Sequence, residues 1–319
     1  MNRFTSFAVA LFVALMAVAP LFLNAYHVDV LNSIGLYGLL ALSLNLILGE
    51  AGLFNMGHAA FYAMGAYTAA ILNTRYQIPI LWTLPLSALV AGFFALAVAR
   101  PVVHLRGDYL LIVTIGVSEI VRIALVNDVF GITGGANGIF GISRPELFGF
   151  VIRQPQHFYY LIWGFVAFTI FLFLRLKQSR FGRALNYLRE DEVAAEGSGV
   201  NTDYYKLAVF GLGAAWAGMA GTLFAAKMTI ISPESFSFWE SVVLFMIVIL
   251  GGAGNVAGVL LAAFLVIGLP ELFREFSSAR MLVFGLVMMV MMLVRPQGLL
   301  PAKSRQFSFA ELSNKGSFR

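Results

Sequence analysis

The sequence contains no cysteine and few charged residues, and each scarcity excludes classes of protein. Without cysteine the chain forms no disulfide, iron–sulfur cluster or thiolate metal site. The four histidines show no HExxH or similar ligand spacing, so we expect no metal site. Charged residues make up 12% of the chain and hydrophobic ones 60%, and the mean hydropathy is +0.85. This composition excludes a soluble enzyme and a secreted disulfide scaffold.

The chain also lacks the interleaved aromatic and basic residues of an RNA-binding surface, despite its net charge of +5. We therefore expect no nucleic-acid partner. In a chain this apolar the expected surroundings are a lipid bilayer, where Lys and Arg collect in the cytoplasmic loops.

The charged residues divide the chain into uncharged runs of membrane-spanning length. A bilayer core about 30 Å thick needs about 20 residues of helix. Uncharged runs lie at 4–28, 30–49, 51–74, 76–99, 154–174, 207–226 and 241–270. The predicted fold class is all-α, a polytopic membrane protein with about ten transmembrane or re-entrant helices.

We place these apolar segments near residues 5–23, 33–48, 54–72, 80–99, 109–127, 157–174, 207–227, 239–250, 256–270 and 281–294. The first resembles a secretory signal, but no convincing A-x-A cleavage site precedes Tyr26, so we interpret it as a retained span. The segments 239–250 and 256–270 are short for spans. Two short passes and one re-entrant hairpin both remain open there.

The basic residues predict an orientation. With the N-terminus inside, fourteen of the 21 Lys and Arg residues fall on the cytoplasmic side, which favours both termini in the cytoplasm. We expect one transmembrane domain over residues 1–300 and a cytoplasmic tail over 301–319.

Two stretches outside the predicted spans are long enough for roles of their own. Residues 128–156 form a glycine-rich periplasmic loop, and residues 175–206 form the most charged cytoplasmic segment. Helix formers over residues 183–196, followed by glycine, predict one or two short helices at the membrane surface. We interpret such helices as a binding surface for a cytoplasmic partner.

Glycine interrupts the apolar pattern in two similar places. Residues 47–52 read ILGEAG and residues 249–254 read ILGGAG, both at predicted cytoplasmic turns. An internal repeat and a chance match both remain open. We expect these breaks to unwind the helices and let the backbone line a cavity. Elsewhere Ala214, Gly218 and Gly221 lie on one helical face, which predicts close helix packing.

Ionisable residues at membrane depth are functional candidates because burying charge is costly. Glu50 and His58 share a face only if the chain stays helical across the glycines between them, which we do not expect. We interpret His58 as a neutral, hydrogen-bonded side chain. Glu119 and Arg122 lie three residues apart on one face, so we predict an ion pair. A substrate contact is the alternative for that pair.

Several motifs follow one another from about residue 30 to residue 300. They are Leu44–Gly49 leading into Gly57–Phe61 and Gly65–Tyr67; Leu105–Tyr109 with Thr114 and Glu119–Arg122; Thr133–Gly135 with Asn137–Ile139; Ser179–Ala184; Arg189–Glu192; Gly251–Gly254; and Arg295–Leu299. Together and in this order, these motifs are specific for one protein family. By these motifs the chain resembles the permease subunits of branched-chain amino acid ABC transporters, of the LivM type.

The resemblance implies a cytoplasmic loop that docks a coupling helix into an ATPase subunit, through a loosely kept EAAxxxG pattern. Ala194, Ala195 and Gly199 match this pattern, whereas Val193 occupies the Glu position. The expected ATPase-coupling residues are Arg189, Glu190, Asp191, Glu192, Ala194, Ala195 and Gly199.

The resemblance also implies half of a translocation path. Its candidate residues are Asn45, Glu50, Asn55, His58, Thr114, Glu119 and Arg122. Glu50 and Asn55 depart from the aliphatic or aromatic residue and the Ser expected at those positions. In the periplasmic loop the candidates are Thr133, Gly134, Gly135, Asn137 and Gly138.

The complex implied is an importer in the bacterial inner membrane. This chain would pair with a second permease of the LivH type above two cytoplasmic ATPase subunits, and a periplasmic binding protein would deliver Leu, Ile or Val. The chain itself is expected to be no enzyme and to bind no cofactor. ATP and Mg would belong to the ATPase subunits, and GxxxxGK[ST] does not occur here. Urea or short-chain amides remain open as substrates.

The residues alone are also consistent with a second class of transport protein. An ion-gradient-driven secondary transporter would use Glu50, His58 and Glu119 as relay groups. Residues 183–199 distinguish the two classes, because a proton-coupled carrier needs no docking helix. An intramembrane enzyme is disfavoured, since no nucleophile has a base at plausible spacing.

If Glu119 pairs with Arg122, Glu119→Gln is expected to destabilise the protein, because an unpaired arginine remains at membrane depth. Adding Arg122→Gln is expected to restore part of the lost stability, measured by thermal unfolding in detergent. A stable Glu119→Gln protein without transport would instead indicate a functional contact.

Overall fold

The computed structural model describes residues 19–105, 107–129, 131–147, 150–272 and 298–301, together with Gly285, Met289, Leu293 and Arg295. Most of the predicted segments 5–23 and 281–294 lies outside the described residues, as do Arg106 and almost all of the tail over 301–319.

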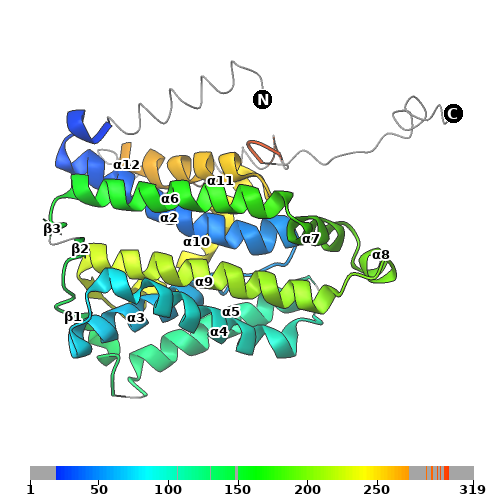
Figure 1. The fold of residues 1–319 in the computed structure, drawn as a ribbon, viewed down its shortest axis with the longest axis horizontal. Coiled ribbons are helices and arrows are strands. Elements are labelled where there is room, and N and C mark those ends of the chain that lie inside the picture. The colour runs from blue at the N-terminus through cyan, green and yellow to red at the C-terminus, as the bar shows by residue number, and fades with distance from the viewer. Residues whose placement is uncertain are drawn as a thin grey trace.

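The described part of the chain is a bundle of helices that run back and forth along one axis (Figure 1). The helices are α2 (Ala25–Asn45), α3 (His58–Tyr76), α4 (Leu84–Val102), α5 (Asp108–Val126), α6 (Pro155–Gln178), α7 (Arg180–Glu190), α8 (Glu192–Gly197), α9 (Thr202–Met228), α10 (Phe238–Gly251), α11 (Val256–Ala263) and α12 (Leu269–Leu272). The π-helical stretches η1 (Leu46–Glu50) and η5 (Phe264–Gly268) extend α2 and join α11 to α12. Short 3-10 turns are η2 (Ile80–Thr83), η3 (Gly135–Asn137) and η4 (Pro233–Phe236).

The bundle has two distinct ends (Figure 1). At one end α7 and α8 project beyond the long helices. At the other, β1 (Ile139–Phe140) pairs antiparallel with β4 (Ile230–Ile231), and β2 (Glu146–Leu147) pairs antiparallel with β3 (Phe150–Val151). We refer to these as the α7/α8 end and the β end.

Among the residues that the structure describes, six helical segments are long and apolar enough to cross a membrane. They are Ala25–Glu50, Ile80–Val102, Asp108–Val126, Pro155–Gln178, Thr202–Met228 and Pro233–Gly251. This confirms a helical, polytopic membrane protein. The segment predicted at 54–72 begins as a helix only at His58, because residues 52–57 are the non-helical break that the glycines predicted.

The region left open by the sequence, residues 239–270, forms two antiparallel helices. With η4, α10 belongs to an apolar segment over Pro233–Gly251. Residues 256–272 then form a helical stretch about 25 Å long that returns toward the β end. Gly268 lies against Ile34, in the first half of α2. Both helices therefore run along most of the bundle, which favours two passes over a shallow hairpin.

Helix α9 packs between α3 and α4 at very close range. A Cβ atom at Gly65 of α3 would overlap the Gly218 carbonyl of α9, and Gly218 itself lies on Ser87 and Ala91 of α4. Gly221 faces Tyr62 in the same way. The small-residue face predicted for α9 is thus confirmed as a helix-packing surface.

Gly65→Ala is expected to destabilise the bundle by about 1–3 kcal/mol, because the added methyl group forces α3 and α9 apart. Gly116→Ala is the matched control, since a Cβ on that helical glycine meets no atom within 4 Å. Thermal unfolding of the purified protein in detergent measures both. Equal unfolding midpoints for the two variants would show that the close approach does not limit stability.

Candidate functional site

The segment between α6 and α9 forms two short helices, α7 and α8, in agreement with the prediction. Ser179 begins α7, where its Oγ accepts a hydrogen bond from the Gly182 amide at 3.3 Å. Asp191 begins α8, where its Oδ1 accepts from the amides of Val193 and Ala194 at 2.9 and 3.1 Å. Each helix therefore starts at a side-chain cap.

One face of this segment packs inward and the other is open. Leu185, Leu188 and Ala195 are buried, with Ala195 only 3% exposed. Tyr187 and Val193 are 59% and 63% exposed. These two apolar side chains are therefore available for contact with a partner.

A buried lysine ties α8 to the bundle. Lys206, near the start of α9, is 2% exposed, and its Nζ donates to Glu192 Oε1 at 2.6 Å and to the Val103 carbonyl at 3.2 Å. Removing one partner of such a pair typically costs about 3–5 kcal/mol. Lys206 is one of the fourteen basic residues on the predicted cytoplasmic side, and its position in the sequence does not indicate this contact.

The seven predicted coupling residues therefore occupy different environments. Asp191 caps α8, Glu192 holds Lys206, and Ala195 is buried, so these three position the segment. Glu190, Ala194 and Gly199 are exposed at its surface. The guanidinium of Arg189 reaches back to the carbonyl of Gly49.

The two glycine-rich breaks meet at the α7/α8 end. Asn45 Oδ1 accepts a hydrogen bond from the Gly254 amide at 2.8 Å. Lys177 Nζ, near the end of α6, donates to Glu50 Oε1 and to the Gly254 carbonyl, each at 2.6 Å. Sequence reasoning missed Lys177 as a partner, although a buried carboxylate at Glu50 indicates a nearby cation.

The two breaks also have similar local structure. Gly52 and Gly254, which occupy the same place in the two copies of the short motif, both have positive φ, 72° and 88°. Asn55 and Asn255 then each accept a hydrogen bond from the amide two residues ahead, before the next helix begins. The short sequence match is therefore accompanied by a glycine with positive φ and an asparagine cap in each break.

A second group of candidates lies around His58. The hydroxyl of Ser43 donates to the Leu40 carbonyl, so the 2.7 Å contact between Ser43 Oγ and His58 Nε2 requires the proton on Nε2. Asn55 Nδ2 lies 3.4 Å from His58 Nδ1 and donates to it. His58 is thus a neutral, hydrogen-bonded side chain, as the sequence predicted.

The same group joins several helices. Thr114 of α5 accepts from the Met56 amide at 3.2 Å, and Ser241 of α10 accepts from the Ala59 amide at 2.9 Å. Asn45, Glu50, Asn55, His58 and Thr114 are all buried. None of these five side chains faces open solvent in this structure.

The remaining two candidates, Glu119 and Arg122, form the predicted ion pair on α5. Arg122 Nε donates to Glu119 Oε1 at 2.9 Å. Arg122 Nη1 also lies 3.3 Å from Glu234 Oε1, a contact that local spacing does not indicate. The side chains of Glu119 and Arg122 are 38% and 25% exposed, so Glu119→Gln leaves Arg122 with a second carboxylate and costs less stability than the sequence suggested.

Sequence reasoning also missed Glu240, in the first turn of α10. Tyr37 Oη donates a hydrogen bond to its Oε1, and among the described residues it has no cationic partner. Glu240 directly precedes the longest uncharged run of the chain, residues 241–270, and a carboxylate at the start of an apolar segment indicates a candidate functional residue. Within the part of the chain that the structure describes, no three His, Asp or Glu side chains gather to hold a metal ion.

The predicted periplasmic loop is a set of tight turns docked on the β end. The amide and hydroxyl of Thr133 approach Asp128 Oδ1 at 2.7 and 2.8 Å, and these hydrogen bonds hold the pKa of Asp128 below its usual range. Gly138 has a φ of 77°, and a Cβ there would overlap the Ile231 carbonyl. Only glycine fits this turn, which places β1 beside β4.

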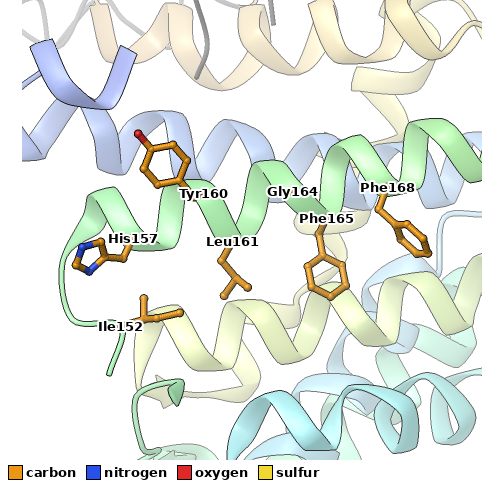
Figure 2. A pocket seen from close by; sticks show the side chains of 7 residues that line it. All are labelled: Ile152, His157, Tyr160, Leu161, Gly164, Phe165 and Phe168. Atoms are coloured by element: carbon orange, nitrogen blue, oxygen red, sulfur yellow. The ribbon is translucent and has the colours of Figure 1, made fainter. Parts of the chain in front are cut away.

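A pocket of about 590 Å³ lies along α6, away from these candidates. Figure 2 shows Leu161 and Phe165 pointing from α6 toward the facing helix, with Ile152 and His157 near the β end of the pocket. Its lining is mainly apolar and contains none of the predicted path residues. A second cleft, of about 260 Å³, lies between Gly52, Phe54 and the coupling residues Arg189 and Asp191.

Comparisons with known proteins identify the family. The family model of the branched-chain amino acid transport system / permease component matches residues 26–294. The chain is 41% identical to the high-affinity branched-chain amino acid transport system permease protein LivM of Escherichia coli K12, over 97% of this chain and 78% of that protein. It is 28% identical to the probable LivM of Methanocaldococcus jannaschii, over 84% of this chain and 91% of that protein.

The permease protein LivH of Escherichia coli K12 is 28% identical as well, over 83% of this chain and 91% of that protein. A comparison with solved structures gives no match. The matched region includes both helix breaks and the α7–α8 segment. The chain therefore belongs to the permease component family of branched-chain amino acid transport systems.

Proposed function

We propose that this chain is a transmembrane permease subunit of an ATP-driven ABC importer and forms half of the translocation path for Leu, Ile and Val. The observation that carries the proposal is the α7–α8 segment, which projects from one end of a membrane-spanning bundle and exposes Tyr187 and Val193. Membership of the family indicates the class of substrate transported, branched-chain amino acids. The chain is then a permease rather than an enzyme.

The α7/α8 end is proposed to face the cytoplasm of a bacterial inner membrane. Basic residues of the α6–α9 connection gather there, which the positive-inside rule supports: Arg175, Lys177, Arg180, Arg183, Arg189 and Lys206. The amides of Leu299 and Leu300 donate to the carbonyls of Leu250 and Gly251 at the same end, at 2.8 and 3.2 Å. That contact supports a cytoplasmic C-terminus, and a crossing by the predicted segment 5–23 would place the N-terminus on the same side.

The proposed complex contains a second permease, two ATPase subunits and a periplasmic binding protein. Because relatives named LivM and LivH both match this chain, a related permease of the LivH type is the proposed partner in the membrane. The ATPase subunits would bind ATP and Mg and dock on α7 and α8, and this chain would bind no cofactor. The β end, with its docked loop, would face the binding protein.

Coupling would proceed by rigid-body movement. Closure of the ATPase pair on ATP would displace α7 and α8, whose buried faces and Lys206–Glu192 contact hold them to α4 and α9. Val193 and Ala194 are exposed and would contact the ATPase, whereas Ala195 faces inward.

The secondary-transporter alternative is less well supported. Its relay groups were Glu50, His58 and Glu119, but Glu50 binds Lys177, His58 bonds Ser43, and Glu119 binds Arg122. They belong to three separate sets of contacts among the described residues and form no continuous chain. A segment such as α7–α8 also has no role in a proton-coupled carrier.

Proteoliposomes containing this permease, its partner permease and the ATPase subunits are expected to accumulate leucine only when ATP and a loaded binding protein are both present. ATP without the binding protein, and a proton gradient without ATP, are the controls. Accumulation driven by the proton gradient alone would contradict an ATP-driven importer. Accumulation of urea in place of leucine would change the substrate class but not the mechanism.

A further inference from the structure

Lys177 and Arg189 connect the coupling segment to the two helix breaks. Lys177 lies near the end of α6, directly before α7, and Arg189 lies in the last turn of α7. Lys177 Nζ reaches Glu50 Oε1 in the first break and the Gly254 carbonyl in the second, each at 2.6 Å. Arg189 donates to the Gly49 carbonyl. The corner between α6 and α7 is thus bonded to both breaks at once.

The two breaks are also bonded to each other. Asn45 Oδ1 accepts from the Gly254 amide at 2.8 Å. The first break ends α2 and leads to α3, and the second ends α10 and leads to α11. If the α6–α7 corner is displaced while these hydrogen bonds remain, the ends of four helices, α2, α3, α10 and α11, are therefore displaced with it.

The burial of Glu50 makes the ion pair between Glu50 and Lys177 costly to separate. The side chain of Glu50 is only 8% exposed, whereas that of Lys177 is 37% exposed. Separating the pair would leave a buried carboxylate without its cation, which is costly in an apolar setting. Lys177 is nearer the surface. The cation of the pair therefore lies at the α6–α7 corner, and the buried anion lies in the first helix break.

We propose that Glu50 and Lys177 are positioning residues that transmit the displacement of α7 and α8 to the helix breaks, and that their contact persists through the transport cycle. This inference rests on the proposed function, because it needs an ATPase to move α7 and α8. It gives Glu50 a role at the coupling corner rather than in contact with substrate.

The test compares Glu50→Gln and Lys177→Met in the complete transporter, reconstituted with its partner permease, ATPase subunits and binding protein. The readout is the amount of leucine taken up per ATP hydrolysed. Each variant is expected to lower this ratio about tenfold, within the usual range for coupling between sites, while ATP hydrolysis continues. Asp29→Asn is the matched control, since it removes a similar ion pair, Lys227–Asp29 at 3.1 Å, between α2 and α9. That variant is expected to keep the wild-type ratio.

A cross-link then tests whether the contact persists. The chain has no cysteine, so Glu50→Cys with Lys177→Cys introduces the only two thiols of this subunit. Without treatment this double variant is expected to be uncoupled. A bifunctional thiol reagent that spans the two positions is expected to restore coupled uptake, and a reductant that cleaves it to abolish uptake again.

Three results would overturn the proposal. They are wild-type uptake per ATP in both Glu50→Gln and Lys177→Met, a fall in Asp29→Asn as large as theirs, and a cross-linked protein that stays uncoupled. If Glu50→Gln does not assemble, Lys177→Met decides, because the Lys177 side chain is partly exposed. Failure of the wild-type complex to use ATP for uptake would instead contradict the proposed function.

Discussion

Where a helix breaks inside a membrane protein, the released backbone groups must find partners within the protein. This chain breaks after Glu50 and after Gly251, and both breaks lie at the α7/α8 end. Asn45 and Lys177 bind the Gly254 amide and carbonyl, and Arg189 binds the Gly49 carbonyl. The contacts that satisfy these groups are the ones that join the long helices to the projecting segment.

Close packing gives those contacts a stable framework. Glycine on α9 brings α3 and α4 within backbone contact, so the centre of the bundle has little room to shift. The α7/α8 end holds more charge, including the buried Lys206 and its partner Glu192. Movement of α7 and α8 is therefore expected to be passed to whole helices rather than absorbed locally. An importer driven by cytoplasmic ATPase subunits needs this combination.

Much of the fold could be predicted from the sequence, because membrane spans are set by local composition. The uncharged runs locate most of the long helices, and helix formers followed by glycine locate α7 and α8. Glu119 and Arg122 were predictable as a pair because they are neighbours on one helix. Lys177 with Glu50, and Tyr37 with Glu240, were not, since 127 and 203 residues separate the partners. Their meeting depends on helix packing, which a single sequence does not specify.

The proposed function requires α8 to contact an ATPase subunit on the cytoplasmic side, and site-specific cross-linking detects such a contact. Val193→Cys places a thiol on the exposed face of α8, in a subunit without other cysteines, and Ala136→Cys places one on the exposed surface of the β end. With a short thiol-to-amine reagent, Val193→Cys is predicted to give a covalent product with the ATPase subunit, and Ala136→Cys none. No product from Val193→Cys, or an ATPase product from Ala136→Cys, would contradict contact between α8 and the ATPase subunit.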